Sequence, residues 1–230
     1  MEEKKIPTGI PGFDKLIGGG FTPESVNLLS AGPGCGKTIF CLQFLWNGLT
    51  KYNEPGLFIS FEENLVDLKR DALMFGWDFE KYIEQGMCNF IYYHPYEVRD
   101  IHNELERQIR SVNAKRVVID STSVYGMTME TEFEVRKGLF DLSRVLKEMH
   151  CVSLLTSEIV ERGDNSGYRY SRFGVEDFLA DSIILIQFES LGGEFSRSLI
   201  VRKMRRTKND EDVHPMEISE HGIVVHDLEE

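Results

Sequence analysis

Residues 31–38 read Ala-Gly-Pro-Gly-Cys-Gly-Lys-Thr, and no other segment constrains the fold of this chain as strongly. The segment follows an apolar run at 26–30 and opens an amphipathic run at 39–49. Strand, glycine-rich turn and helix in that order form a phosphate-binding loop, in which backbone N–H groups and the positive end of a helix face one anion. The pattern therefore predicts a nucleotide site. The alternative is a glycine-rich turn that only caps a helix. It is disfavoured because the Lys-Thr pair directly follows the last glycine, at the spacing of a phosphate-binding loop.

Within this segment each residue type has a role. Lys37 supplies a cation for the outer phosphates of ATP, and the Thr38 hydroxyl suits Mg²⁺. Ala31 stands where the common pattern G-x-x-x-x-G-K-[ST] has glycine, which costs little if its φ is negative. The residues expected to contact the nucleotide are Gly32, Pro33, Gly34, Cys35, Gly36, Lys37, Thr38 and Ile39.

Cys35 lies inside this loop, beside Lys37 and a predicted helix N-terminus. Both neighbours favour the thiolate, so one interpretation is a reactive thiol that bound MgATP would protect. The other is an inert small residue that fills the turn. The sequence leaves both open.

Composition limits the partners of the chain. Its 230 residues carry 26 basic and 38 acidic side chains, a formal charge of −12, which argues against broad affinity for nucleic acid or anionic lipid. The first five residues lead into no apolar segment, and runs such as 178–188 are too short for a bilayer. The 4 cysteines form no CxxC pair and the 6 histidines show no ligand spacing, so a disulfide framework or zinc site is not expected. We expect a cytoplasmic protein without membrane contact.

Apolar runs alternate with helical patterns along most of the chain, which predicts a mostly parallel sheet with crossover helices on both faces. The expected helices are 39–50, 64–75, 98–112 and 131–149, and in the last one Phe133, Leu139, Leu142, Leu146 and Met149 form one buried face. The expected strands are 26–30, 57–61, 88–92, 116–120, 151–156, 182–188, 195–204, 214–219 and 223–226. The last strands follow one another with turns at Gly192-Gly193 and His221-Gly222, which predicts C-terminal antiparallel hairpins in a single domain over 1–230.

Carboxylates follow two of the predicted parallel strands. Asp120 ends the strand 116–120, and in a P-loop fold such a residue orients Mg²⁺ or a bound water, although a lone aspartate there is usually a turn residue. Glu62 and Glu63 follow the strand 57–61, at the sheet edge where ligands of α/β proteins bind. One of them can deprotonate the attacking water, or they can cap the next helix. Residues 156–158 bring polar groups to the same edge. They can act as a γ-phosphate sensor, or they can simply end the strand.

Residues 202–208, Arg-Lys-Met-Arg-Arg-Thr-Lys, form the most basic stretch of this acidic chain. If 200–206 is a strand, Lys203 and Arg205 share one face. A matched pair of cations suits a focused anion such as a γ-phosphate, and no aromatic stripe favours single-stranded nucleic acid. A solvated hairpin and a nucleic-acid contact remain alternatives.

Together these residues resemble the single-domain KaiC-like ATPases of the RecA superfamily, which are related to the clock protein KaiC and to RadA. The resemblance covers nearly the whole chain, and the phosphate loop is its most specific part. The other matching segments are Thr8-Gly9-Ile10-Pro11-Gly12-Phe13-Asp14 with Gly18-Gly19-Gly20, Phe61-Glu62-Glu63, Val118-Ile119-Asp120-Ser121, Phe173-Gly174-Val175-Glu176 and Lys203-Met204-Arg205-Arg206-Thr207.

The resemblance implies a RecA-like P-loop NTPase that binds MgATP at the subunit interfaces of a homo-oligomeric ring, a hexamer, and hydrolyses it. In that pattern Glu62 and Glu63 are the catalytic glutamates, Thr38 and Asp120 hold Mg²⁺, and Lys203 and Arg205 act on the neighbouring subunit's nucleotide. A DNA-binding recombination accessory like a RadA paralogue and a nucleotide-dependent switch or scaffold with a protein partner are the two alternatives.

Two departures from the family pattern stand out. Residues 176–178 are Glu-Asp-Phe where the autokinase half of KaiC has the Ser and Thr that receive phosphate, so self-phosphorylation at this place is excluded. Arg206 stands where the family usually has glycine after Met-Arg.

Overall fold

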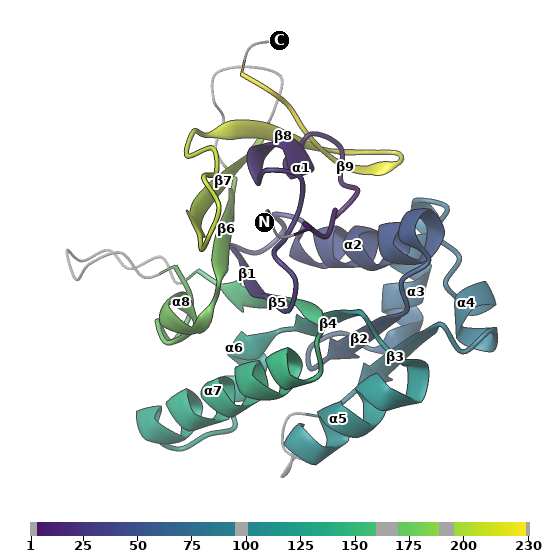
Figure 1. The fold of residues 1–230 in the computed structure, drawn as a ribbon, viewed down its shortest axis with the longest axis vertical. Helices are drawn as coiled ribbons and strands as arrows, with labels where there is room; N and C mark the ends of the chain where they lie inside the picture. Colours follow the sequence, from purple (N-terminus) through teal and green to yellow (C-terminus); the bar gives the residue numbers. More distant parts are fainter. Residues whose placement is uncertain (1–3, 95–100, 160–169, 189–195, 229–230) are drawn as a thin grey trace.

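The computed structural model describes residues 4–94, 101–159, 170–188 and 196–228, and these form a nine-stranded sheet in the order β3-β2-β4-β5-β1-β6-β7-β8-β9 (Figure 1). The strands from β3 to β6 in this order are parallel, and the last three pairings are antiparallel. The strands are β1 (Val26–Ala31), β2 (Gly56–Ser60), β3 (Cys88–Tyr92), β4 (Arg116–Asp120), β5 (Val152–Glu158), β6 (Ser182–Gln187), β7 (Arg197–Met204), β8 (His214–Ser219) and β9 (Gly222–Val225). The predicted mostly parallel sheet with C-terminal antiparallel strands is confirmed.

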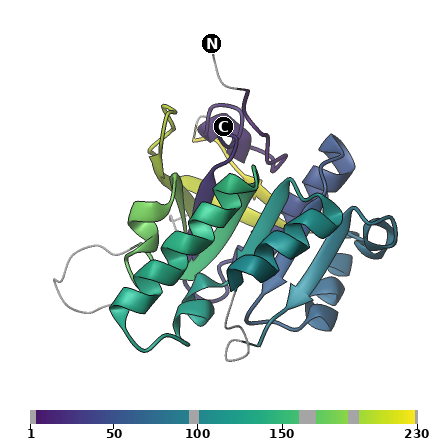
Figure 2. The ribbon, with the colours of Figure 1, turned by 60° about the horizontal axis from the view of Figure 1, so that its bottom comes forward.

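Helices cover both faces of this sheet, as predicted (Figures 1 and 2). The helices of the described residues are α1 (Phe13–Leu16), α2 (Lys37–Tyr52), α3 (Leu65–Met74), α4 (Glu80–Glu84), α5 (Ile101–Val112), α6 (Thr122–Gly126), α7 (Glu132–Glu148) and α8 (Glu176–Leu179). Alternate residues of β1 enter different hydrophobic clusters: Leu29 packs with residues of α2 and α3, and Leu28 packs with residues of α5 and α7. This alternation is the geometry of a sheet buried on both sides.

Side-chain caps fix the starts of two long helices. The Asn64 side chain accepts hydrogen bonds from the backbone N–H groups of Val66 and Asp67 and caps α3. Thr131 and Glu134 form a capping box at the start of α7. Such caps satisfy N–H groups that have no partner inside the helix.

The buried face of α7 differs from the prediction at its first turn. Leu139, Leu142 and Leu146 are buried as predicted, but Phe133 is 73% exposed and Val135 is buried in its place. At about 100° per residue, Phe133 lies roughly 200° around the helix from Val135, so it points away from the sheet.

The other predicted boundaries agree with the structure to within a few residues where it describes them. The sequence patterns missed four short helices, α1, α4, α6 and α8, which have 4 or 5 residues each. The turn at His221-Gly222 is confirmed, since Gly222 starts β9 with a φ of 110°. The predicted turn at Gly192-Gly193 and the start of the predicted helix 98–112 lie outside the described residues.

One buried cation joins α2 to the sheet. Arg116, at the start of β4, has a fully buried side chain and donates to Glu54 Oε2 at 2.6 Å, to the Phe44 carbonyl at 2.9 Å and to the Pro7 carbonyl at 2.7 Å. Its guanidinium also lies 4.7 Å from the centre of the Phe44 ring. The Arg116 side chain can pack this closely against α2 because Gly48 has no side chain: a Cβ at Gly48 would lie 2.5 Å from Arg116 Cδ.

Candidate nucleotide-binding site

The predicted site residues other than Lys203 and Arg205 converge on one edge of the sheet, at the carboxyl ends of four adjacent parallel strands. The register places Ala31 of β1 beside Glu158 of β5, and Ser60 of β2 beside Asp120 of β4. The loop 31–38, Asp120 and the turn 61–63 therefore surround one place, where parallel α/β sheets bind their ligands.

The backbone of the glycine-rich loop has the curled form that the motif predicts. Gly34 and Gly36 have φ values of 70° and 101°, in the left-handed region, whereas Gly32 does not. A Cβ at Gly36 would also come within 2.9 Å of Ile218 Cδ1. Ala31 is the last residue of β1, in ordinary extended conformation, so the alanine in place of the motif's first glycine needs no special backbone.

The Cys35 side chain is 3% exposed and belongs to the hydrophobic cluster that includes α2. Reactive thiols need access as well as a favoured thiolate. This burial matches the interpretation of Cys35 as a packing residue of the turn, whose contact with a nucleotide would come from its backbone N–H group.

Lys37 begins α2, and its side chain folds back over the loop. Its Nζ atom donates hydrogen bonds to the carbonyl oxygens of Ala31 at 3.2 Å and Gly32 at 3.0 Å. The ammonium group thus lies at the mouth of the loop, and phosphate oxygens are stronger partners for it than neutral carbonyls are.

Asp120 lies at the centre of the polar contacts at this edge. Its carboxylate is 4% exposed and accepts hydrogen bonds from the hydroxyls of Thr38, at 3.0 Å, and Thr156. Burial raises the pKa of Asp120, while these two hydrogen bonds and the charge of Lys37 oppose the shift. The peptide bond that follows it, to Ser121, is cis.

This pair of oxygen ligands fits Mg²⁺. Mg²⁺ prefers hard oxygen ligands and usually takes only one or two from the protein, with the rest from phosphates and water. Thr38 and Asp120 supply one hydroxyl and one carboxylate in direct contact. Among the described residues no group of three or more His, Cys, Asp or Glu side chains is placed to hold a metal ion.

Glu62 and Glu63 lie in a turn that Ser60 holds in place, since its hydroxyl accepts from the N–H groups of Glu62 at 3.3 Å and Glu63 at 3.0 Å. Burial and the negative charge of Asp120 raise the pKa of both glutamates. Lys37 opposes the shift at Glu62, whose carboxylate also accepts a weak 3.4 Å hydrogen bond from Ser121. Neither glutamate is the N-cap of α3, because Asn64 has that role.

The end of β5 connects this edge to the start of α8. Glu176 is buried and accepts hydrogen bonds from Ser157 at 3.3 Å and Ser171 at 2.8 Å. One position further, Glu158 forms an ion pair with Arg172 at 2.7 Å. Sequence reasoning singled out the strand end but missed Arg172, because nothing in the pattern of residues 170–175 marks it as a partner of this edge.

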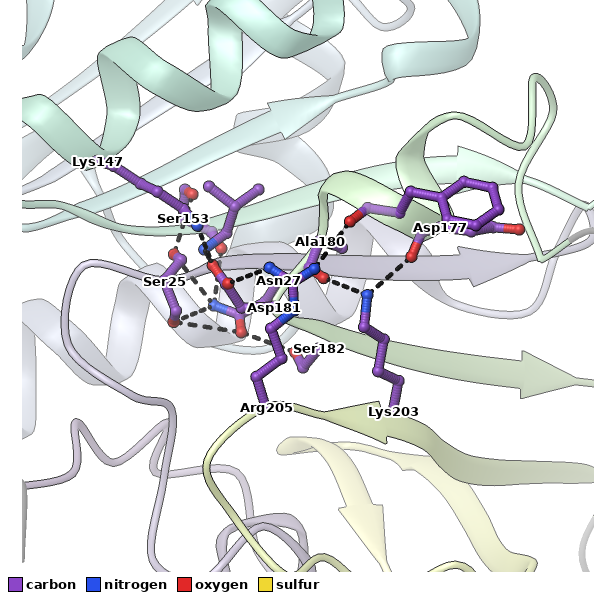
Figure 3. A network of polar contacts seen from close by, with 12 residues as sticks. Ser25, Asn27, Lys147, Ser153, Asp177, Ala180, Asp181, Ser182, Lys203 and Arg205 are labelled. Atoms are coloured by element: carbon purple, nitrogen blue, oxygen red, sulfur yellow. Dashed lines mark hydrogen bonds and ion pairs between the residues drawn. The ribbon is translucent and has the colours of Figure 1, made fainter.

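Lys203 and Arg205 point in a common direction, as their predicted shared face requires (Figure 3). They lie toward the amino ends of β1 and β6, at the opposite edge of the sheet from the phosphate loop. Lys203 of β7 pairs with Ile183 of β6, and the Arg205 N–H group donates to the Asp181 carbonyl, which precedes β6. Through Ile183, Lys203 is level with Leu28 of β1, and through Asp181, Arg205 is level with Val26, whereas the phosphate loop follows Ala31 at the end of β1. At ~3.3 Å per residue, Lys203 lies about 10 Å and Arg205 about 16 Å before that end, measured along β1.

The turn after β7 also accounts for Arg206. Its φ of 58° lies in the left-handed region, which glycine adopts without strain, so the glycine of the family pattern given above would suit this place. The arginine keeps the same backbone form.

Fold and site together define a P-loop ATPase of the RecA-like superfamily. The family model described as "ATPase: KaiC" matches residues 6–230, and the chain belongs to this KaiC family.

Two curated relatives and a solved structure agree with this family assignment. The chain is similar to the UPF0273 protein PH0284 of Pyrococcus horikoshii, with 37% identity over 97% of this chain and 94% of that protein. It is also 34% identical to the circadian clock oscillator protein KaiC of Prochlorococcus marinus, where it covers 45% of the longer protein. A crystal structure of the KaiC-like protein PH0186 from Pyrococcus horikoshii superposes with a TM-score of 0.87 at 37% identity, over 97% of this chain and 99% of that one.

None of the helices in the described part of the chain combines the length and apolar character that crossing a bilayer requires. The cytoplasmic location and the single domain over 1–230 stay predictions.

Proposed function

We propose that the protein binds MgATP at this edge of the sheet and hydrolyses it at the interfaces of a homo-oligomeric ring. The observation that carries the proposal is the arrangement of Lys37, Thr38, Asp120 and the Glu62-Glu63 turn at one edge of the sheet, beside the glycine-rich loop. A cation, a metal-binding pair and a carboxylate of raised pKa are the parts that phosphoryl transfer to water needs.

Each part has a separate task in the reaction. The loop N–H groups and Lys37 hold the phosphates, and Thr38 with Asp120 would hold Mg²⁺, which offsets the negative charge of the phosphate oxygens when it is bound. Glu62 takes a proton from the attacking water. We assign this role to Glu62 first because it is close enough to Asp120 and Lys37 for both charges to shift its pKa.

Lys203 and Arg205 complete the site of a neighbouring subunit. Measured along β1, Lys203 lies about 10 Å and Arg205 about 16 Å from the phosphate loop of their own chain, and β6 lies between β7 and β1, so neither side chain is long enough to reach that loop. A neighbour in a head-to-tail ring would bring its own Lys203 and Arg205 to the open side of the γ-phosphate. Cations of this kind contribute ~10³-fold or more to turnover in P-loop enzymes.

The test combines two inactive variants. Glu62→Gln/Glu63→Gln lacks the base but keeps Lys203 and Arg205, and Lys203→Ala/Arg205→Ala lacks the cations but keeps the base. Each variant alone is expected to bind MgATP and to lose turnover. Mixed rings contain some interfaces with both parts intact, so steady-state ATP hydrolysis should partly return after mixing.

Subunit exchange is checked in the same samples with two fluorescent labels. If subunits exchange and no hydrolysis returns, the cations do not act on the neighbour. If the wild-type protein binds MgATP without measurable turnover, the chain is a nucleotide-dependent switch instead. A rate that rises strongly with single-stranded DNA and falls with salt would favour the recombination accessory.

A further inference from the structure

The cations at the second edge are held in place within their own chain, by the short helix α8 and the residues that follow it (Figure 3). Lys203 Nζ donates to the carbonyl oxygens of Asp177 at 2.9 Å and Ala180 at 2.7 Å. Arg205 donates to the Phe178 carbonyl at 3.0 Å and to Asp181 Oδ1 at 3.2 Å. Both head groups therefore sit on the carboxyl end of α8, where carbonyl groups attract cations.

Asp181 is the one side chain among the described residues that accepts a hydrogen bond from either of these cations. Its other oxygen, Oδ2, accepts from the Val26 N–H group at 3.0 Å and from Lys147 of α7 at 2.7 Å. The Asp181 backbone N–H group also donates to the Val26 carbonyl at 2.7 Å. The carboxylate is thus fixed to the first residue of β1 from both its backbone and its side chain.

The support beneath Asp181 is polar and rigid. Asn27 of β1 is buried, donates to the Ser153 carbonyl of β5 at 3.0 Å and accepts from the Ser182 hydroxyl of β6 at 2.7 Å. The Asn27 amide also donates to the Ser25 hydroxyl oxygen at 2.9 Å. Three neighbouring strands are joined at the place from which Asp181 projects, so its carboxylate has little freedom to move.

The charge of Asp181 suits it to this contact. Burial raises its pKa, but the hydrogen bonds from Lys147 and Val26 and the charges of Lys147 and Arg205 outweigh burial, and the pKa lies below its ordinary value. The group is therefore an ionised acceptor across the neutral pH range. A charged acceptor holds a guanidinium more strongly than a carbonyl does.

We propose that Asp181 is a positioning residue that presents Arg205 to the nucleotide of the neighbouring subunit. This inference rests on the proposed action of Arg205 across the interface. Two of the five guanidinium N–H groups of Arg205 are used by its contacts among the described residues, and the side chain is 49% exposed. The remaining donors can meet a phosphate while Asp181 and the Phe178 carbonyl fix the plane of the guanidinium. Asp181 thereby holds the Arg205 side chain in one orientation, so that Arg205 does not have to be ordered when it meets the phosphate.

The experiment uses the full chain with Asp181→Asn, which keeps the shape of the side chain and removes its charge. We expect kcat to fall about tenfold or more, because a misplacement of about 1 Å can cost ~10²-fold in rate, while KM for ATP changes little. Each subunit keeps its own phosphate loop intact, which is why binding should survive. Lys147→Met is the matched control, since it removes the other cation on Asp181 without touching Arg205, and its kcat should fall much less.

Mixing then separates a positioning role from general damage. Asp181→Asn mixed with Glu62→Gln/Glu63→Gln should regain hydrolysis, because the second variant supplies an undisturbed Arg205 to an intact base. Asp181→Asn mixed with Lys203→Ala/Arg205→Ala should stay low, because no interface then has a well-positioned Arg205. Equal recovery in both mixtures, or a wild-type kcat for Asp181→Asn alone, would overturn the inference.

Two further samples serve as controls for misfolding and for the proposed action across the interface. If the Asn variant does not fold by circular dichroism, Asp181→Glu carries the same mixing test, because it keeps the charge and displaces it by one methylene. The mixture of the base-deficient and cation-deficient variants is run beside it. If that mixture stays inactive, the proposed action across the interface fails; if it recovers while Asp181 variants complement both partners, only the role of Asp181 fails.

Discussion

At the scale of single residues, Glu62 and Glu63 share one turn but meet different surroundings. Asp120 raises the pKa of both, and Asp71 and Asp67 act on Glu63 as well. Only Glu62 has Lys37 among the charges that shift its pKa. This nearness to the loop cation is why the proposed function assigns the activation of water to Glu62 first.

A pH profile tests the raised pKa of Glu62. A general base must be deprotonated, so activity is lost as pH falls through its pKa, and a raised pKa moves that loss to higher pH. We expect the acidic limb of kcat/KM, which reports the free enzyme, to lie above the ordinary glutamate value of 4.5. Glu63→Gln should keep an acidic limb, whereas Glu62→Gln should abolish turnover. A limb at or below pH 4.5 would contradict the assigned base.

The sequence predicted where a candidate site residue lies in the fold when that residue belongs to a local motif or directly follows an apolar strand. The loop 31–38 carries its own spacing, and Asp120 and Glu62 follow apolar strands, so their place at one edge could be predicted before any contact was known. Asp181 carried no such signal. Its role depends on Lys147, Val26 and Arg205, which are distant in sequence and meet only in the folded sheet.

At the scale of elements, two helices contain a glycine in their interior for different reasons. A Cβ at Gly48 of α2 would press on Arg116, whose head group is held by several partners. A Cβ at Gly138 of α7 would meet the terminal methyl of Met129, which can rotate away.

Alanine at these two places should therefore have opposite effects. Alanine favours a helix interior over glycine by about 1 kcal/mol. Gly138→Ala is expected to leave the free energy of unfolding unchanged or to raise it by up to about 1 kcal/mol. Gly48→Ala should lower it by about 1–3 kcal/mol through overpacking. Urea unfolding of both variants makes the comparison, and a stabilised Gly48→Ala would show that the Arg116 contacts yield easily.

Long helices and buried strands were predictable because their apolar periodicity is strong. The four short helices were not, because 4 or 5 residues give no period to detect. The exposed Phe133 has a different origin: a phenylalanine by itself favours burial, but Val135, Leu139, Leu142 and Leu146 recur at the helical period and Phe133 lies about 200° around the helix from Val135. The period along the whole helix, and not the apolar character of one residue, sets the buried face.

At the scale of the whole molecule, the proposed function divides the catalytic parts between two edges of the sheet and so links activity to assembly. In this proposal MgATP binding uses groups of one chain, whereas turnover uses groups of two. Dilution should therefore lower the rate of hydrolysis per chain once the oligomer dissociates, while binding of a fluorescent ATP analogue persists.

Light scattering measured in parallel gives the assembly state at each concentration. A constant rate per chain through a range in which the oligomer demonstrably dissociates would show that one chain is a complete enzyme. Asp181→Asn should follow the same dilution curve at a lower rate, because its defect lies within each interface.

The fold class could be predicted from alternating elements, but the strand order could not be read from any local pattern. That order, with β7 antiparallel beside β6, carries Lys203 and Arg205 back to the amino edge of the sheet. The sequence showed that both cations share a face, and only the register of β6 and β7 shows how far this face lies from the loop.

The separation of these two edges also gives each subunit a polarity. A contact that joins a donor edge to an acceptor edge is heterologous, so it repeats in one direction until the assembly closes on itself. Any open chain of subunits would keep one nucleotide site without cations at one end and one unused pair of cations at the other. Closure alone makes all sites equivalent, so the last subunit to join would complete two active sites at once.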